Sequence, residues 1–340
     1  MATYAEIGIH LDDARRTTER LEQIVARARG AGVLADVGAF GGMFRLGAAG
    51  TFADPVLVAS TDGIGTKVKI AAALGRYNAL GTDIVNHCVN DIAVQGARPL
   101  FFLDYLAQHR ADPDVVTAIV AGVADACAAV GCSLLGGETA EMPDVYPPGE
   151  FDLAGFVVGV MDRATIGANG APAAGDILLG LPSTGLHTNG YSLARRALPP
   201  ATWGEFDPAL NMTVGEALLA AHRSYLAEIQ KLIGVGARRF AHITGGGFAE
   251  NVARVMPPDL TAEIDATTWA PPAIFGRIAG DGCVLPDEMY RVFNMGIGLV
   301  GIVPEERVGE AIGTVPEAVV IGEIVPRGGD PAVRLLGLAA

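Results

Sequence analysis

Residues 60–69 carry side chains suited to binding phosphate together with a divalent cation. The segment supplies a carboxylate, two glycines, hydroxyls and lysines, in the order Ser60-Thr61-Asp62-Gly63-Ile64-Gly65-Thr66-Lys67-Val68-Lys69. Glycines let backbone N–H groups approach an anion closely, and Mg²⁺ prefers hard oxygen ligands such as a carboxylate. The spacing fits neither the Walker A pattern nor G-x-G-x-x-G, so an ordinary turn is the alternative.

A second polar group lies on a predicted helix. Asp83, His87 and Asp91 are spaced four residues apart, so a helix places them on one face. A solvated polar face is one interpretation. The surrounding residues are apolar, however, and the next strand, 100–105, has the composition of a buried strand. We therefore expect the polar face to line a cleft, where Asp91 and Asp62 converge on one cation.

Three further glycine-rich junctions carry a glutamate or a histidine. Glu138 lies in Gly136-Gly137-Glu138-Thr139, a position typical of an open α/β site, although a plain turn is the alternative. His187 and His242 each lie beside glycine and threonine where a helix begins, and such junctions direct backbone N–H groups at anions. Each histidine could instead have a structural role, bonding to its own loop.

The elements that would position these residues alternate between strand and helix. Strands are expected at 55–59, 100–105, 133–135, 152–160 and 176–181. Helices are expected at 12–28, 84–95, 112–130 and 214–233, with others beginning at 191 and near 247. Residues 162–176 have the composition of a linker. The pattern predicts an α/β (α+β) protein with two domains, 1–165 and 173–340.

Composition restricts the class of protein. Of 340 residues, 50% are hydrophobic and 18% are charged, which favours a globular enzyme. The net charge of −14, without a basic cluster, argues against binding nucleic acid. Apolar runs are too short to span a bilayer and the N-terminus lacks signal-peptide features, so we expect no membrane partner and a cytoplasmic location. The 4 cysteines form no C-x-x-C pair, so buried free thiols are expected rather than zinc.

The order and length of these motifs resemble the phosphoribosylformylglycinamidine cyclo-ligases, the aminoimidazole ribonucleotide synthetases of purine biosynthesis. The resemblance extends through nearly the whole chain. It rests on Tyr4-Ala5-Glu6-Ile7-Gly8-Ile9, residues 60–69, Cys88-Val89-Asn90-Asp91, Val94-Gln95-Gly96-Ala97, 99–105, 136–143, Ala154-Gly155-Phe156, 185–193, 242–248 and 288–296.

This resemblance implies an ATP-dependent C–N ligase. Such an enzyme converts formylglycinamidine ribonucleotide to 5-aminoimidazole ribonucleotide, ADP and phosphate through a phosphorylated formyl oxygen, an iminophosphate. The resemblance also implies Mg²⁺ and a homodimer in which the first domains join strands into a shared barrel. In this arrangement an N-terminal segment folds over ATP, and the second domain is a sheet flanked by helices that binds the substrate.

Residue roles follow from the same resemblance. The residues expected to bind ATP and its phosphates are Asp62, Gly63, Gly65, Thr66, Lys67, Asn90 and Gly137. The expected metal ligands are Asp62, Asp91 and Glu138. The expected catalytic residues are His187, His242 and Asp91. The expected substrate-binding residues are Thr188, Asn189, Gly245, Gly246 and Gly247.

Two positions depart from the family pattern. Glu22 stands where the family has a lysine in the nucleotide region, so Arg20 or Arg27 is expected to supply that charge, and His87 replaces an apolar residue.

Four relatives share the ATP-binding architecture: thiamine monophosphate kinase, selenophosphate synthetase, a hydrogenase-maturation carbamoyl dehydratase and formylglycinamidine ribonucleotide synthetase. The second and third should carry cysteines near the N- and C-terminus respectively, whereas the first cysteine here is Cys88 and the chain ends in alanine. A non-catalytic nucleotide-binding regulator is the alternative from another class.

Overall fold

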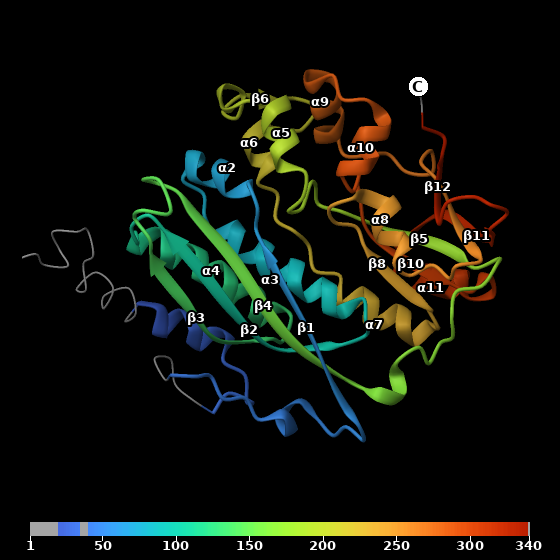
Figure 1. The fold of residues 1–340 in the computed structure, drawn as a ribbon, viewed down its shortest axis with the longest axis horizontal. Helices are drawn as coiled ribbons and strands as arrows, with labels where there is room; N and C mark the ends of the chain where they lie inside the picture. The colour runs from blue at the N-terminus through green and yellow to red at the C-terminus, as the bar shows by residue number, and fades with distance from the viewer. Residues whose placement is uncertain (1–19, 35–39, 339–340) are drawn as a thin grey trace, which may run out of the picture. The chain divides into compact units, whose positions relative to one another are not determined.

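The chain divides into two compact units. The computed structural model describes residues 20–34 and 40–338. Within these residues the first unit contains the chain up to Ile92 together with Ala97–Asp162, and the second contains Ala93–Gly96 and the chain from Arg163 onward (Figure 1). The expected helix at 12–28 is described only from residue 20, with 20–25 helical and Ala26–Ala28 forming the 3-10 helix η2. The motif at 4–9 and the expected N-terminal clamp lie outside the described residues.

The first unit is built on a four-stranded sheet in the order β1-β4-β2-β3. Strand β4 is antiparallel to both β1 and β2, whereas β3 is parallel to β2. The strands are β1 (Pro55–Gly63), β2 (Arg98–Gln108), β3 (Ser133–Glu141) and β4 (Phe151–Asp162).

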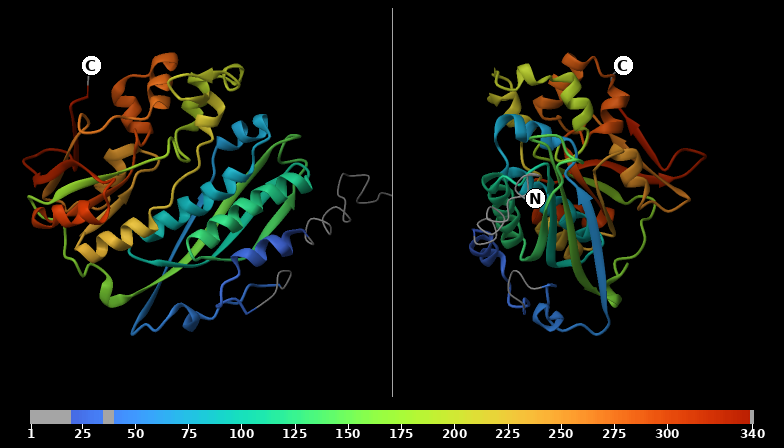
Figure 2. Two further views of the ribbon diagram at one scale, coloured as in Figure 1. Left: turned by 180° about the vertical axis from the view of Figure 1, so that it is seen from behind. Right: turned by 60° about the vertical axis from the view of Figure 1, so that its left-hand side comes forward.

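Helices α3 (Asn78–Ala93) and α4 (Pro113–Ala129) cover one face of this sheet, as the left view of Figure 2 shows. Gly155 in β4 permits this packing, because a Cβ atom there would collide with side chains of α3. The two helices also touch backbone to backbone, since a Cβ on Gly81 of α3 or Gly122 of α4 would meet main-chain atoms of the other helix. The expected start of α4 is confirmed: the side chain of Asp112 accepts hydrogen bonds from two backbone N–H groups of its first turn, and proline follows it.

The opposite face of the first sheet carries exposed apolar side chains. Leu57 of β1 exposes 62% of its surface and Phe156 of β4 exposes 43%. Leu103 of β2 is paired with Phe156 and therefore points to the same side. Near the β3 edge the ring of Phe44 covers Phe101, with ring centroids 5.6 Å apart. The remaining apolar area is of a kind that proteins usually cover with another surface.

Strands β1 and β3 are longer than the sequence indicates. Residues 60–63 continue β1 and pair with β4, and residues 136–141 continue β3 and pair with β2. The interpretation of 136–141 as a plain turn is therefore wrong, whereas in 60–69 a turn follows the strand at Gly65 and Thr66. Glycine is uncommon in strand interiors, and this weakened the strand signal at both places.

The second unit contains a six-stranded sheet in the order β12-β9-β11-β5-β10-β8, antiparallel except for the β12/β9 pair. Strand β10 is buried along its whole length. The strands are β5 (Ile177–Pro182), β8 (Arg239–His242), β9 (Leu260–Asp265), β10 (Ile297–Val303), β11 (Val319–Pro326) and β12 (Val333–Leu336). A short ribbon pairs β6 (Phe206–Asp207) with β7 (Met212–Thr213).

Seven helices accompany this sheet in the described residues. They are α5 (Tyr191–Ala197), α6 (Val214–Leu218), α7 (Leu226–Val235), α8 (Gly247–Ala253), α9 (Ala273–Gly282), α10 (Pro286–Val292) and α11 (Val308–Thr314). The expected mixed α/β fold with two units is confirmed. None of the helices that the structure describes has both the length and the apolar character that crossing a bilayer requires.

The single helix predicted at 214–233 is wrong, because residues 219–225 separate α6 from α7. Carbonyl groups that a continuous helix would use internally accept hydrogen bonds from elsewhere. Tyr191 Oη donates to the carbonyl of Leu218, and the hydroxyl of Thr184 donates to the carbonyl of Ala221. These tertiary hydrogen bonds override a local sequence that contains neither proline nor glycine.

Candidate active site

Asp62 and Asp91 lie together in the first unit. Ser60 Oγ is 3.4 Å from Asp62 Oδ2 and 3.3 Å from Asp91 Oδ2, so one hydroxyl reaches both carboxyl groups. Ser60 and Asp62 are two residues apart in β1 and therefore point to the same side, toward α3. His87 Nε2 of α3 is 3.4 Å from Asp62 Oδ1. The strand and the helix thus bring together two of the three residues that the sequence proposed as metal ligands.

The charge state of Asp62 reflects this crowding. Burial, followed by the negative charge of Asp91, raises the pKa of Asp62 from 3.8 to about 7. A divalent cation would favour the ionised form of both groups, and the oxygen donors match the preference of Mg²⁺. These residues therefore fit the ion, with Asp62 and Asp91 as the side chains that would hold it.

The polar face of α3 is buried rather than solvated. Lys67 Nζ lies 2.7 Å from Asp83 Oδ2, and both side chains are fully buried. Burial lowers the pKa of Lys67, while the negative charge of Asp83 acts in the opposite direction. The ammonium group is thus held by Asp83, and because the Lys67 side chain is fully buried, its predicted contact with phosphate requires the surrounding structure to open.

Three of the other residues predicted to contact phosphate, Gly63, Gly65 and Thr66, lie around the start of α2 (Lys67–Leu74). Gly63 ends β1, and Gly65 has φ +66°, a conformation that glycine adopts readily. Thr66 directly precedes the helix, and Asn90 is buried in α3. Their roles in binding ATP stay predictions.

Glu138 does not join the Asp62/Asp91 pair within one chain. The strand registers align Asp62, Gly155, Asp104 and Gly137 in one row that faces α3 and α4. Glu138 follows Gly137 and therefore points to the other face of the sheet. It also lies on the opposite edge strand from Asp62, about 14 Å away by three interstrand spacings. One chain therefore does not place Glu138 at an ion held by Asp62 and Asp91.

Asp104 is a buried carboxyl group that the sequence analysis did not select. It lies in the same row as Asp62, and its side chain is 7% exposed. Burial raises its pKa from 3.8 to about 7. The folded protein therefore favours the protonated form, and ionisation of Asp104 at higher pH opposes folding.

Replacing Asp104 with asparagine is expected to make the free energy of unfolding less sensitive to pH. The stability that protonated Asp104 contributes is fully present below pH 3.8 and is lost as pH rises to about 7, a change of up to about 4 kcal/mol. Urea unfolding at pH 5 and pH 8 measures this, and the stability of the variant relative to wild type should be greater at pH 8 than at pH 5. Exposed Asp152 of β4, changed to asparagine, is the control. An equal pH dependence in D104N and wild type would contradict the expectation.

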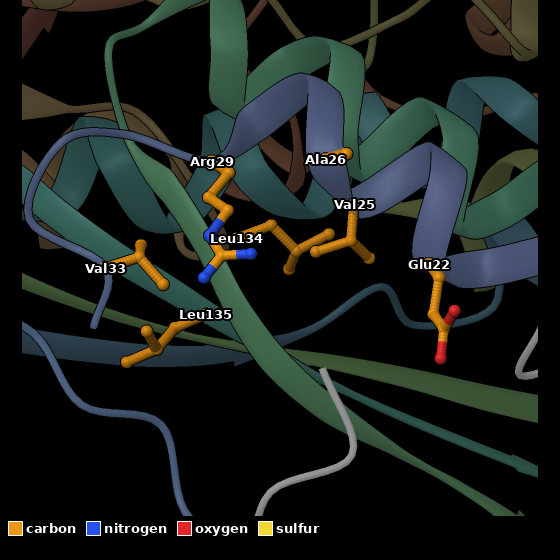
Figure 3. A pocket seen from close by; sticks show the side chains of 7 residues that line it. All are labelled: Glu22, Val25, Ala26, Arg29, Val33, Leu134 and Leu135. Carbon is orange, nitrogen blue, oxygen red and sulfur yellow. The ribbon is translucent and has the colours of Figure 1, made fainter. Parts of the chain in front are cut away.

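Glu22 and Arg29 line a cavity of about 40 Å³ beside β3, shown in Figure 3. Arg20 and Arg27 are directed elsewhere, toward α4. Arg20 Nη1 is 2.9 Å from Asp114 Oδ1, and Arg27 Nη1 is 3.7 Å from Asp125 Oδ1. The expectation that Arg20 or Arg27 compensates for Glu22 is therefore not supported by their positions, since Arg29 is the arginine that shares the cavity with Glu22.

The two histidine-bearing loops of the second unit lie on either side of β10. Residues 183–190 follow β5 and residues 243–247 follow β8, and both strands pair with β10. The amide of Ser183 donates to the carbonyl of Gly296, and that of Ile243 donates to the carbonyl of Gly298. A Cβ on Gly245 would lie 3.3 Å from Asn189 Oδ1, so residues predicted to bind substrate meet here. Gly246 and Gly247, which begin α8, have positive φ angles.

Two asparagines that the sequence analysis missed support these loops. Asn251 Nδ2 donates to the carbonyls of Thr244, Gly245 and Gly247 at 3.3, 3.2 and 2.8 Å. Asn294 Nδ2 donates to the carbonyl of Gly185 at 2.9 Å, and Asn294 Oδ1 accepts from Ser183 Oγ at 2.9 Å. Asn294 belongs to a segment that carried the family resemblance, and this was the available signal.

A third histidine lies between the two predicted ones. The rings of His187 and His222 are stacked with centroids 3.9 Å apart, and His222 Nε2 is 3.0 Å from His242 Nε2. All three side chains are buried. The sequence analysis missed His222 because it placed this residue inside a continuous helix.

His187 is held in one protonation state by its own loop. The backbone amide of Thr184 lies 3.3 Å from His187 Nε2, and an amide can only donate. Nε2 therefore carries no proton, and the neutral ring carries its proton on Nδ1. Because His187 is also fully buried, a direct contact with substrate requires this loop to move.

The fold and the loop arrangement match one superfamily. Residues 47–161 match the family described as AIR synthase related protein, N-terminal domain, and residues 173–333 match the corresponding C-terminal domain. Together the two domains cover most of the chain, which belongs to the AIR synthase-related superfamily.

Solved structures show the same fold. Thiamine-monophosphate kinase from Stenotrophomonas maltophilia K279a is 17% identical, with a TM-score of 0.66 over 94% of this chain and 96% of that chain. The hydrogenase maturation protein HypE of E. coli is 17% identical, with a TM-score of 0.66 over 96% and 94%. A HypE structure in complex with ATP is 16% identical, with a TM-score of 0.66 over 95% and 90%. At these identities the similarity concerns the fold.

Proposed function

We propose that this chain is an ATP-dependent phosphoribosylformylglycinamidine cyclo-ligase that uses Mg²⁺. The observation that carries the proposal is the pair of adjoining loops in the second unit, where Gly245 lies beside Asn189 and His222 links His242 to Thr188. These loops combine imidazole, amide and backbone N–H groups, which suit a phosphorylated substrate that must exchange a proton. The carboxyl pair of the first unit supplies the oxygen donors that a metal-bound nucleotide needs.

The proposed reaction has two steps. The γ-phosphoryl group of ATP is transferred to the formyl oxygen, which makes the formyl carbon a better electrophile. The amidine nitrogen then attacks that carbon, the carbon–oxygen bond breaks, phosphate leaves, and the nitrogen loses a proton. We assign proton acceptance to His242 and binding of the ribose phosphate to Thr188, Asn189 and the amides of 245–247.

Product analysis tests this function. The purified chain is incubated with formylglycinamidine ribonucleotide, ATP and Mg²⁺, and the expected products are 5-aminoimidazole ribonucleotide, ADP and phosphate in equal amounts. H242Q should lose most of this turnover. Absence of the aminoimidazole product would overturn the assignment.

A second candidate is phosphoryl transfer to a phosphate group, as in the structurally similar thiamine-monophosphate kinase. A kinase of this type makes a diphosphate product and ADP without free phosphate. Incubation with thiamine monophosphate and ATP distinguishes it, because only the cyclo-ligase releases free phosphate.

The proposal includes a homodimer formed by the exposed apolar face of the first sheet. Leu57 and Phe156 lie on this face, and burying such side chains is favourable by about 25 cal/mol per Å². Analytical ultracentrifugation of the full chain measures its mass in solution. Since the proposed substrates are nucleotides of purine biosynthesis, we assign the activity to the cytoplasm.

A further inference from the structure

His222 contacts both histidine-bearing loops of the second unit. Its Nδ1 lies 3.4 Å from the hydroxyl of Thr188, and its Nε2 lies 3.0 Å from Nε2 of His242. The ring also stacks on His187, with an angle of 16° between the ring planes. Residues 219–225 thus bring one imidazole between two loops that are distant in the sequence.

The bond between His222 and His242 constrains their protons. Two Nε2 atoms at 3.0 Å form a hydrogen bond only when one of them carries a proton and the other accepts it. If His222 donates to His242, the neutral His222 ring accepts from the Thr188 hydroxyl through Nδ1. If His242 donates, the neutral His222 ring donates from Nδ1 to the Thr188 oxygen. The two imidazoles therefore change tautomer together.

The geometry does not favour a metal ion shared by the three histidines. An imidazole binds a metal through a lone pair in the plane of its ring. The rings of His187 and His222 are nearly parallel and 3.9 Å apart, so their lone pairs lie in separate planes and do not converge. The short distance between His222 and His242 is explained by a hydrogen bond.

We infer that His222 is a positioning residue for His242 and the central member of a proton-sharing chain from Thr188 to His242. The inference rests on the proposed function for its catalytic meaning. His222 is 1% exposed and does not touch substrate. It fixes the orientation of the His242 ring. While the hydrogen bond between the two Nε2 atoms persists, His242 can exchange a proton with another group only through its Nδ1.

The first test reads the protons directly and needs no turnover. In protein labelled with ¹⁵N-histidine, NMR should show one hydrogen-bonded proton shared by Nε2 of His222 and Nε2 of His242. Among ionisable groups, His187 stacks on His222. Tyr225 in turn lies against His187, and the guanidinium group of Arg223 lies over the Tyr225 ring. H222Q should remove the shared signal and change the tautomer ratio of His242.

T261V is the control for a generally loosened second unit. Thr261 is buried in β9 and donates a hydrogen bond to the carbonyl of Pro331 at 2.8 Å, so its loss weakens the same sheet far from β8. This variant should leave the His242 signals unchanged. If H222Q fails to fold, T188V tests the other end of the chain and should shift the tautomer ratio of His222.

The second test uses kinetics. H222Q should lower kcat by about tenfold with KM for ATP within about twofold, and H222Q/H242Q should be no slower than H242Q, because the two residues act as one unit. Additive losses in the double variant, or His242 signals that H222Q leaves unchanged, would overturn the inference. Stoichiometric Co²⁺ binding that H222Q abolishes would also overturn it and indicate a metal site. Failure of ring closure alone would leave the NMR test intact and count only against the proposed function.

Discussion

Replacing Lys67 with methionine is expected to lower the free energy of unfolding by about 3–5 kcal/mol, because it leaves the buried charge of Asp83 without its ammonium partner. Both side chains of this ion pair are fully buried. Removing one member of such a pair is more harmful than removing both charges, so K67M/D83N should recover much of the lost stability. Denaturant unfolding measures each variant.

Lys69 provides a matched control for this prediction. It lies two residues further along α2 and pairs with Glu150, but its side chain is 36% exposed. K69M should therefore change stability by less than about 1 kcal/mol. If K67M instead folds with wild-type stability and raises KM for ATP, Lys67 acts as the phosphate ligand that the sequence predicted.

Asp91→Asn is expected to weaken Mg²⁺ binding and to reduce metal-dependent turnover at least about tenfold while leaving the fold intact. The substitution removes one of two converging carboxylates. It also removes one of the two main causes that raise the pKa of Asp62, although burial remains, so this pKa should fall below about 7 and stay above 3.8. In wild type, Mg²⁺ binding should weaken as pH falls below about 7, and in D91N this weakening should occur at lower pH.

Calorimetric titration of Mg²⁺ between pH 5.5 and 8.5 measures both effects, with D114N as the control. Asp114 lies on α4, and its side chain is 91% exposed. Turnover of D91N within about threefold of wild type, less than about 1 kcal/mol of transition-state stabilisation, would show that Asp91 is not a metal ligand.

Local sequence signals predicted the elements whose ends are marked by residues typical of helix termini. Asp112 and Pro113 set the start of α4, and helix spacing placed Asp83, His87 and Asp91 on one face of α3. The approach of Asp62 to Asp91 followed from their positions after a strand and on a helix.

Other features depend on contacts between distant residues and were not accessible from the sequence. The side of the sheet that Glu138 faces depends on strand order and register, because a shift of one residue reverses every side chain. The break at 219–225 depends on donors in another loop, Thr184 and Tyr191. The partner of Lys67 is Asp83 of the next helix, whereas the motif alone suggested that Lys67 binds phosphate.

The contact between Gly81 and Gly122 has a mechanical consequence for the site. Helix α3 carries Asp83 and Asp91, and here it rests directly on the main chain of α4 without intervening side chains that could change rotamer. A displacement of α4 would therefore be transmitted to α3 as a rigid shift. The distance between Asp91 and the β1 carboxylate should therefore be adjustable from Gly122, so that substitutions outside the carboxyl pair tune which size of cation the pair prefers.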